Sequence, residues 1–207
     1  MKGMMKMFKN KLKCMTTICV AFALCLCALC GCGADEAPES NYDLEPKRVE
    51  VTMDSGEKFI IETAPSFAPE TCANFLSLVE EGFYNGLTFH RVIDGFVAQG
   101  GDPNGNGTGG SSKSIRGEFA ENGFEQNTLS HTRGVVSMAR LGGDMDSATS
   151  QFFICYDTLT SLDGKYAAFG KVVEGMEVVD KFLEVQRDGA GMPSNPIVIK
   201  EMKIIEN

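Results

Sequence analysis

The sequence contains no tryptophan and only two histidines, His90 and His131. Two histidines are too few for a histidine-rich metal site, and neither belongs to an HExxH motif. A G-x-S-x-G motif, which would place a serine nucleophile between a strand and a helix, is also absent. These absences exclude several common hydrolase chemistries, and we expect neither a metal nor another cofactor.

Cysteine is abundant at the N-terminus and scarce elsewhere. Six of the eight cysteines lie within residues 1–32, which leaves Cys72 and Cys155, and these two form no CxxC pair or zinc-binding pattern. An oxidising compartment would permit a disulfide between them. We favour two free, buried thiols, because Cys72 falls on a predicted helix and Cys155 on a predicted buried strand.

The glycine-rich run 100–110 has two tempting interpretations that its neighbours do not support. A phosphate-binding loop is excluded, because no Gly-Lys-Ser/Thr follows and no helix is predicted to start there. Residues 102–107 match the first half of an EF-hand calcium loop, but Lys113 stands where the loop needs a bidentate glutamate. We therefore predict a surface loop without bound calcium.

The N-terminal segment has the features of a secretory signal. Five lysines and no acidic residue precede an uncharged run from Cys14 to Ala34. Leu29-Cys30-Gly31-Cys32 resembles a bacterial lipobox, so we predict a signal peptide over 1–31 and lipid on Cys32. The alternative is an uncleaved span, since the run approaches the roughly 20 apolar residues that cross a bilayer. Both interpretations place the rest of the chain outside the cytoplasm, attached to the bacterial cell membrane.

The charge balance of the remaining chain is strongly acidic. Removing the five leader lysines leaves 14 basic and 28 acidic residues, a net charge of −14. Long-range attraction will not hold such a protein to nucleic acid or to anionic lipid. Residues 32–47 are rich in acid and proline and poor in large apolar residues, which predicts a solvated tether. No pattern suggests an oligomer, so we expect a monomer.

Alternating apolar residues predict strands throughout residues 48–207. Val49, Val51 and Met53 alternate with polar residues before a turn at 54–56, which predicts a β-hairpin with the following apolar run Phe59-Ile60-Ile61. Six further strands are predicted at 87–93, 96–99, 134–139, 151–156, 167–173 and 197–205.

Two predicted helices flank most of these strands. One begins at Pro69 and ends before Gly82, and the other covers Met176–Val185. Because strands and helices do not alternate, a doubly wound parallel sheet is disfavoured. We predict a mainly β fold, a closed antiparallel barrel with two α-helices, which would leave its loops and one outer face for a site.

Several sequence blocks resemble the cyclophilin family of peptidyl-prolyl cis–trans isomerases. The blocks are FHRVI-x-GFV-x-QGGDP, from Phe89 to Pro103, and SQFFI, from Ser150 to Ile154, and their combination is highly specific. The resemblance extends from Arg48 to Ile205. It implies a closed eight-stranded β-barrel capped by two helices, and isomerisation of Xaa-Pro bonds. With the predicted leader, the substrates would be secreted or surface polypeptides.

The resemblance also implies roles for individual residues. Arg91 matches the catalytic arginine, and Gln99 matches the residue that orients it. Phe96, Val97, Phe153 and Leu162 would form the proline pocket. The remaining substrate-binding residues would be Ala139, Arg140, Gln151 and Tyr166.

Three positions depart from the common pattern of that family. Val97 stands where many members have methionine, and Tyr166 where many have histidine. Ser161 occupies the place of a bulky residue, often tryptophan, which puts cyclosporin sensitivity in doubt. A groove that binds proline-containing segments without turnover is the main rival function. A lipoprotein receptor for a small solute is a more distant one.

Overall fold

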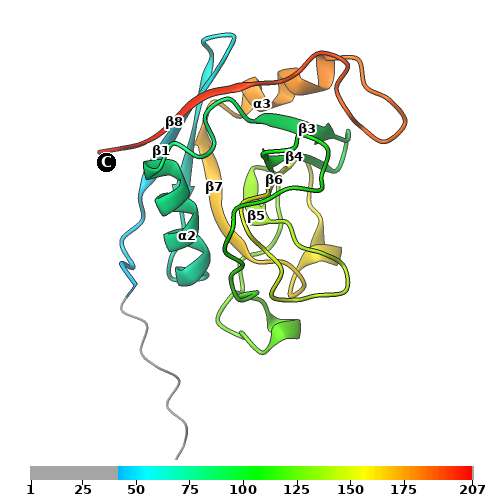
Figure 1. The fold of residues 1–207 in the computed structure, drawn as a ribbon. Coiled ribbons are helices and arrows are strands. Elements are labelled where there is room, and N and C mark those ends of the chain that lie inside the picture. Colours follow the sequence, from blue (N-terminus) through cyan, green and yellow to red (C-terminus); the bar gives the residue numbers. More distant parts are fainter. Residues whose placement is uncertain (1–41, 207) are drawn as a thin grey trace, which may run out of the picture. The chain divides into compact units, whose positions relative to one another are not determined.

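The computed structural model describes residues 42–206. The predicted signal peptide over 1–31, the lipid site at Cys32 and the tether up to residue 41 lie outside the described residues. Eight strands, two α-helices and three 3-10 turns follow one another along the described chain (Figure 1). The strands are β1 Arg48–Met53, β2 Lys58–Thr63, β3 Thr88–Val92, β4 Val97–Asp102, β5 Val135–Met138, β6 Phe152–Cys155, β7 Ala168–Glu174 and β8 Ile199–Ile205. The helices are α2 Pro69–Glu80 and α3 Met176–Asp180, and the 3-10 turns are Ala120–Asn122, Thr160–Leu162 and Lys181–Glu184.

All eight strands join one antiparallel sheet in the order β3-β4-β6-β5-β7-β2-β1-β8. The prediction of eight antiparallel strands with two helices is confirmed. The prediction of a closed barrel is not, because the sheet curls into a half-barrel (Figure 1). Its end strands, β3 and β8, share no continuous ladder in the described chain. An isolated bridge between Thr88 and Val198 and a few neighbouring hydrogen bonds connect this region instead.

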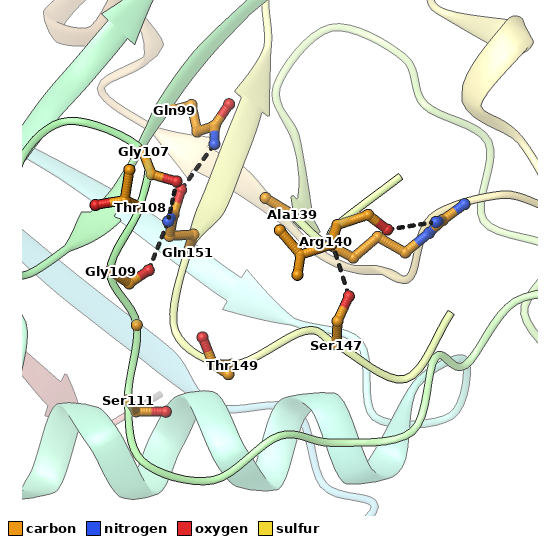
Figure 2. A pocket seen from close by; sticks show the side chains of 12 residues that line it. Gln99, Gly107, Thr108, Gly109, Ser111, Ala139, Arg140, Ser147, Thr149 and Gln151 are labelled. Carbon is orange, nitrogen blue, oxygen red and sulfur yellow. Dashed lines mark hydrogen bonds between the residues drawn. The ribbon is translucent and has the colours of Figure 1, made fainter. Parts of the chain in front are cut away.

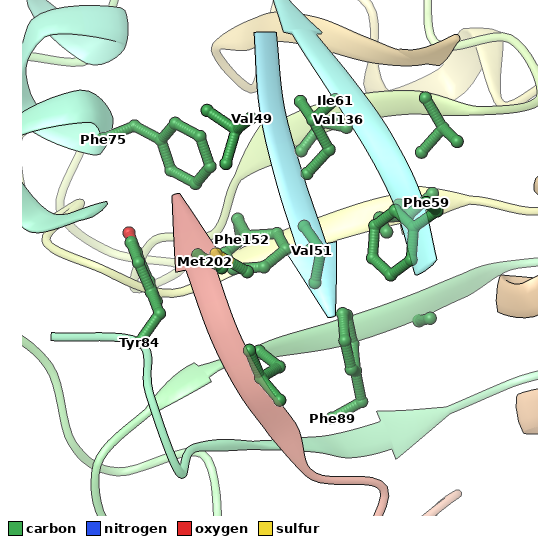
Figure 3. Close-up of a cluster of buried hydrophobic side chains, with 14 of the residues drawn as sticks. Val49, Val51, Phe59, Ile61, Phe75, Tyr84, Phe89, Val136, Phe152 and Met202 are labelled. Carbon is green, nitrogen blue, oxygen red and sulfur yellow. The ribbon is translucent and has the colours of Figure 1, made fainter. Parts of the chain in front are cut away.

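The two faces of the curled sheet carry different apolar clusters. Strands β1 and β2 bury every second residue, so Val49, Val51 and Ile61 all reach the main core (Figure 3). Phe75 of α2 packs there with its ring centroid 5.0 Å from that of Phe169. A smaller cluster on the other face includes Phe153, and this cluster underlies the candidate site.

Helix α2 contacts β7 and β8, whereas α3 contacts β2. Pro69 occupies the first turn of α2, where its missing N–H removes no intrahelical bond. The second predicted helix is wrong in part, because α3 ends at Asp180 and the chain continues as a 3-10 turn over 181–184. Periodicity alone does not separate these two helix types, since both place apolar residues on one face.

The two cysteines of the described chain are free and buried, as predicted. The Cys72 thiol lies 3.3 Å from the carbonyl oxygen of Phe169, and Cys155 belongs to the smaller cluster beside Phe153. Burial raises the pKa of each thiol to about 12. Neither group is therefore a thiolate at neutral pH, which leaves both chemically inert.

Residues 42–206 include no helix long and apolar enough to cross a bilayer.

Candidate functional site

The register of three neighbouring strands brings the central predicted residues together. Arg91 of β3 lies opposite Gln99 of β4, and Gln99 lies opposite Phe153 of β6. Side chains directly opposite each other in antiparallel strands point to the same face. The preceding side chain along β6 points the other way, so Phe152 enters the main core while Phe153 enters the smaller cluster. The sequence spacing of Arg91 and Gln99 is thus the spacing of a hairpin pair.

A cavity of about 120 Å³ opens above this cluster. Nine of the ten residues predicted to act in catalysis or substrate binding line it. They are Arg91, Phe96, Val97, Gln99, Ala139, Arg140, Phe153, Leu162 and Tyr166.

A second cavity of about 290 Å³ adjoins the first and shares Gln99, Ala139 and Arg140 with it. Gln151, the tenth predicted residue, lines this second cavity together with the loop 107–111 (Figure 2). An extended peptide that occupies both cavities would therefore pass the shared residues.

A series of side-chain hydrogen bonds through Gln99 and Gln151 holds Arg91 in place. The Arg91 Nη1 donates to Gln99 Oε1 at 3.3 Å, and Gln99 Nε2 donates to Gln151 Oε1 at 2.9 Å. Gln151 Nε2 in turn donates to the carbonyl oxygens of Gly109 at 2.7 Å and Gly107 at 3.2 Å (Figure 2). The arginine is thereby connected to the glycine-rich loop. Gln151 was predicted to contact substrate backbone, and here its amide is already engaged by the protein.

The Arg91 guanidinium also contacts an aromatic face, since its carbon lies 5.5 Å from the centre of the Phe96 ring. Arginine favours this position because its planar group stacks on a ring while its edge donates hydrogen bonds. Arg91 makes no ion pair with any described residue, so its charge is not neutralised at the cavity. A fixed, unpaired cation therefore stands beside an apolar pocket.

Arg140 is held even more firmly between two rings. Its guanidinium carbon lies 5.1 Å from the centre of Phe119 and 4.9 Å from that of Tyr166. Arg140 Nε donates to the carbonyl of Lys165 at 3.1 Å, and Nη1 donates to the carbonyl of Leu141 at 3.0 Å. Sequence reasoning missed Phe119, because nothing local distinguishes it from an ordinary core residue.

His131 lies beneath the cavity and supports two of its walls. Its ring stacks on Phe153 with centroids 6.0 Å apart, and its Nδ1 lies 2.8 Å from a carboxylate oxygen of Asp163, the residue after Leu162. Its Nε2 lies 3.0 Å from the hydroxyl of Ser137. This Ser-His-Asp arrangement is not a hydrolytic triad, because Ser137 is completely buried and no substrate can reach it. The contacts of His131 therefore give it a structural role beneath the cavity.

Burial makes both histidines sensitive to acid. Loss of hydration lowers the pKa of His131, although Asp163 opposes the change, and burial likewise lowers the pKa of His90. An unfolded histidine then takes up its proton at a higher pH than the folded one. The free energy of unfolding should therefore fall as the pH drops through about 6.5 and below.

Urea unfolding at pH 7 and pH 5 measures this effect. We expect lower stability at pH 5, and a smaller difference in His90→Phe, which keeps a ring but cannot titrate. Equal stability of the wild type at the two pH values, or greater stability at pH 5, would contradict this assignment.

The loop that resembled half of an EF-hand is organised by its own aspartate. The Asp102 carboxylate accepts hydrogen bonds from the backbone N–H groups of Asn104, Asn106 and Gly107 at 2.6–3.0 Å. Together with His90, these bonds lower its pKa against the effect of burial. The aspartate therefore holds the loop that carries the Gln151 contacts. Among residues 42–206, no group of three or more His, Cys, Asp or Glu residues is placed to hold a metal ion.

The family model described as "Cyclophilin type peptidyl-prolyl cis-trans isomerase/CLD" matches residues 48–204. Peptidyl-prolyl cis-trans isomerase B of Bacillus subtilis is 42% identical over 152 residues, which are 73% of this chain and 94% of that protein. Peptidyl-prolyl cis-trans isomerase-like 2 of Gibberella zeae is 40% identical over 173 residues, or 81% of this chain. This chain spans only 29% of the length of that relative.

A solved structure shows the same fold. The crystal structure of a cyclophilin type peptidyl-prolyl cis-trans isomerase from Cryptosporidium parvum matches with a TM-score of 0.71 and 34% identity. The match covers 79% of this chain and 99% of the other. A second structure of that protein, in the presence of the dipeptide Ala-Pro, matches with a TM-score of 0.69.

Proposed function

The chain belongs to the cyclophilin-type peptidyl-prolyl cis–trans isomerase family, and we propose that it isomerises Xaa-Pro bonds in the cavity lined by Arg91. The observation that carries the proposal is the pairing of Arg91 with Gln99 above an apolar pocket. No cysteine, lysine, histidine or carboxylate of the described chain lines that cavity. Rotation about a peptide bond needs none of these groups, because no covalent bond is made or broken.

The slow step is loss of amide resonance in the Xaa-Pro bond, which takes tens to hundreds of seconds without a catalyst. In the twisted state the prolyl nitrogen loses conjugation and becomes a hydrogen-bond acceptor. Arg91 would donate a hydrogen bond to this nitrogen or hold the neighbouring carbonyl. The ring of the substrate proline would pack against Phe96 and Phe153. A donor that is already fixed before the reaction stabilises the twisted state more than a donor that must first reorient. To accelerate the isomerisation by four decades, the protein must lower the activation free energy by ~5.5 kcal/mol.

A rival function is retention of proline-containing segments without turnover. The hydrogen bond that holds Arg91 to Gln99 favours catalysis, because binding alone needs only the apolar pocket. An isomerisation assay distinguishes catalysis from binding alone. A solvent jump shifts the cis–trans equilibrium of a fluorescent Ala-Pro-containing peptide, and the return to equilibrium is followed by fluorescence, without a coupling protease, in the presence of the protein. Acceleration proportional to protein concentration supports the enzyme. Saturable binding of the same peptide without acceleration would support the rival.

We further propose that the protein acts outside the cytoplasm, tethered to the bacterial membrane by lipid on Cys32, as a monomer that assists folding of secreted or surface proteins. The proposal rests on the lysine-rich start, the uncharged run and the lipobox-like residues before Cys32. A diacylglyceryl group supplies the two chains that stable attachment needs. Intact-mass analysis of the protein from membranes should show a lipid-modified chain beginning at Cys32. An unmodified chain beginning at Met1 would overturn it.

A further inference from the structure

The two cavities carry an unexpected charge for such an acidic protein. The full chain has a net charge of −9, yet Arg91 and Arg140 are the charged residues among those that line either cavity. No acidic side chain of residues 42–206 lines them. At physiological ionic strength, charges more than about 8 Å away are largely screened. A bound peptide therefore meets a locally positive surface.

The acidic residues nearest in sequence to the cavity walls form hydrogen bonds with residues other than Arg91 and Arg140. Asp163 accepts bonds from Ser130 and His131, and Asp146 accepts bonds from the N–H of Gly117 at 2.9 Å and from Asn122 at 2.7 Å. These carboxylates stabilise loops and form no ion pair with either arginine. The positive charge of the cavities is thus left for a ligand.

Arg140 is well prepared to receive that ligand. A guanidinium has five N–H donors, and the bonds to Lys165 and Leu141 use two of them. The guanidinium carbon also lies over the rings of Phe119 and Tyr166, which limit its movement. Its remaining donors lie on the edge, which is the geometry that binds a carboxylate. Because Arg140 lines both cavities, a peptide side chain near the proline can reach it.

We propose that Arg140 gives the enzyme a preference for proline segments with an acidic side chain, aspartate or glutamate, within a few residues of the proline. The inference rests on the proposed function of the Arg91 cavity. A partly exposed ion pair of this kind changes binding by up to about fivefold relative to a neutral side chain, and repulsion of a cation adds to the contrast. A glutamate peptide should thus exceed its lysine counterpart in kcat/KM by about three- to tenfold.

The test uses alanine-based peptides with one proline and a single Glu, Gln or Lys, placed at each of three positions on either side of it. In the wild-type protein, kcat/KM should follow Glu > Gln > Lys at one position or more, and the contrast should shrink in 1 M NaCl. Arg140→Gln should abolish the contrast, and Arg140→Lys should retain part of it. Arg116→Gln is the matched control, because Arg116 also lies over a ring, Phe124, but lines neither cavity.

The possible results separate the acidic preference from the isomerase activity itself. Equal rates for the Glu and Lys peptides at all six positions in the wild type would overturn the preference while leaving isomerisation intact. A contrast that survives in Arg140→Gln would assign it to another residue and also overturn the inference. If Arg140→Gln does not fold, Arg140→Lys and the salt dependence of the wild type decide. Failure to accelerate even the Gln peptides would instead contradict the proposed function.

Discussion

Replacing Arg91 with alanine should lower kcat/KM for an Ala-Pro-containing peptide by about 10²–10³-fold, the usual loss when one fixed transition-state donor is removed. The arginine lines the cavity, donates to Gln99 at 3.3 Å and lies over the Phe96 ring. Peptide affinity should change much less, because the apolar walls remain. A protease-free isomerisation assay gives kcat/KM, and peptide titration gives Kd.

The matched control is Arg116→Ala, which also removes an arginine from an aromatic face, at Phe124. It should keep wild-type kcat/KM, because Arg116 lines neither cavity. Circular dichroism and urea unfolding establish that both variants are folded. A folded Arg91→Ala protein with undiminished activity would show that the apolar pocket alone performs the reaction.

The second large effect concerns Glu118, whose buried carboxylate caps helix α2 from a distant loop. It accepts hydrogen bonds from the N–H of Glu70 at 3.0 Å and from the N–H and hydroxyl of Thr71 at 2.8 and 2.6 Å. The N-cap residue of the helix, Ala68, supplies no side-chain acceptor. Burial raises the pKa of Glu118, although these three bonds act in the opposite direction.

Glu118→Ala should lower the free energy of unfolding by about 3 kcal/mol, because it leaves the buried donors of Thr71 without a partner. It should also loosen the neighbouring Phe119 against Arg140. Equilibrium urea unfolding measures the loss, with Glu121→Ala as control, since Glu121 is exposed on the adjacent 3-10 turn. A loss no greater than that of Glu121→Ala would show that the helix does not depend on this cap.

The parts of the structure that the sequence predicted depend on local periodicity. The first hairpin and helix α2 both follow from alternation or spacing within short segments. The relation between Arg91 and Gln99 came instead from the family resemblance, and the strand register places the two opposite each other. The sequence also indicated that Phe153 belongs to a pocket, but this came from the family resemblance. Alternation alone places Phe152 and Phe153 on opposite faces without saying which face is the core.

The parts that the sequence did not predict depend on contacts between distant residues. Glu118 caps a helix 47 positions earlier in the chain, and His131 reaches Asp163 across 32 positions. Their side chains are ordinary types in unremarkable sequence contexts, so only the fold shows their partners. The strand order and the openness of the sheet are similar cases, because strand patterns show where strands lie but not which strands pair or how far the sheet curls.

A fixed Arg91 beside an apolar cavity should accelerate rotation about Xaa-Pro bonds. Exchange spectroscopy by NMR tests it most directly, because it measures the cis–trans rate of an equilibrated Ala-Pro-containing peptide without a coupling enzyme. With a small amount of wild-type protein, we predict an exchange rate that rises linearly with protein concentration, and almost no rise with Arg91→Ala. Unchanged exchange with the wild type, or equal acceleration by both proteins, would contradict the claim.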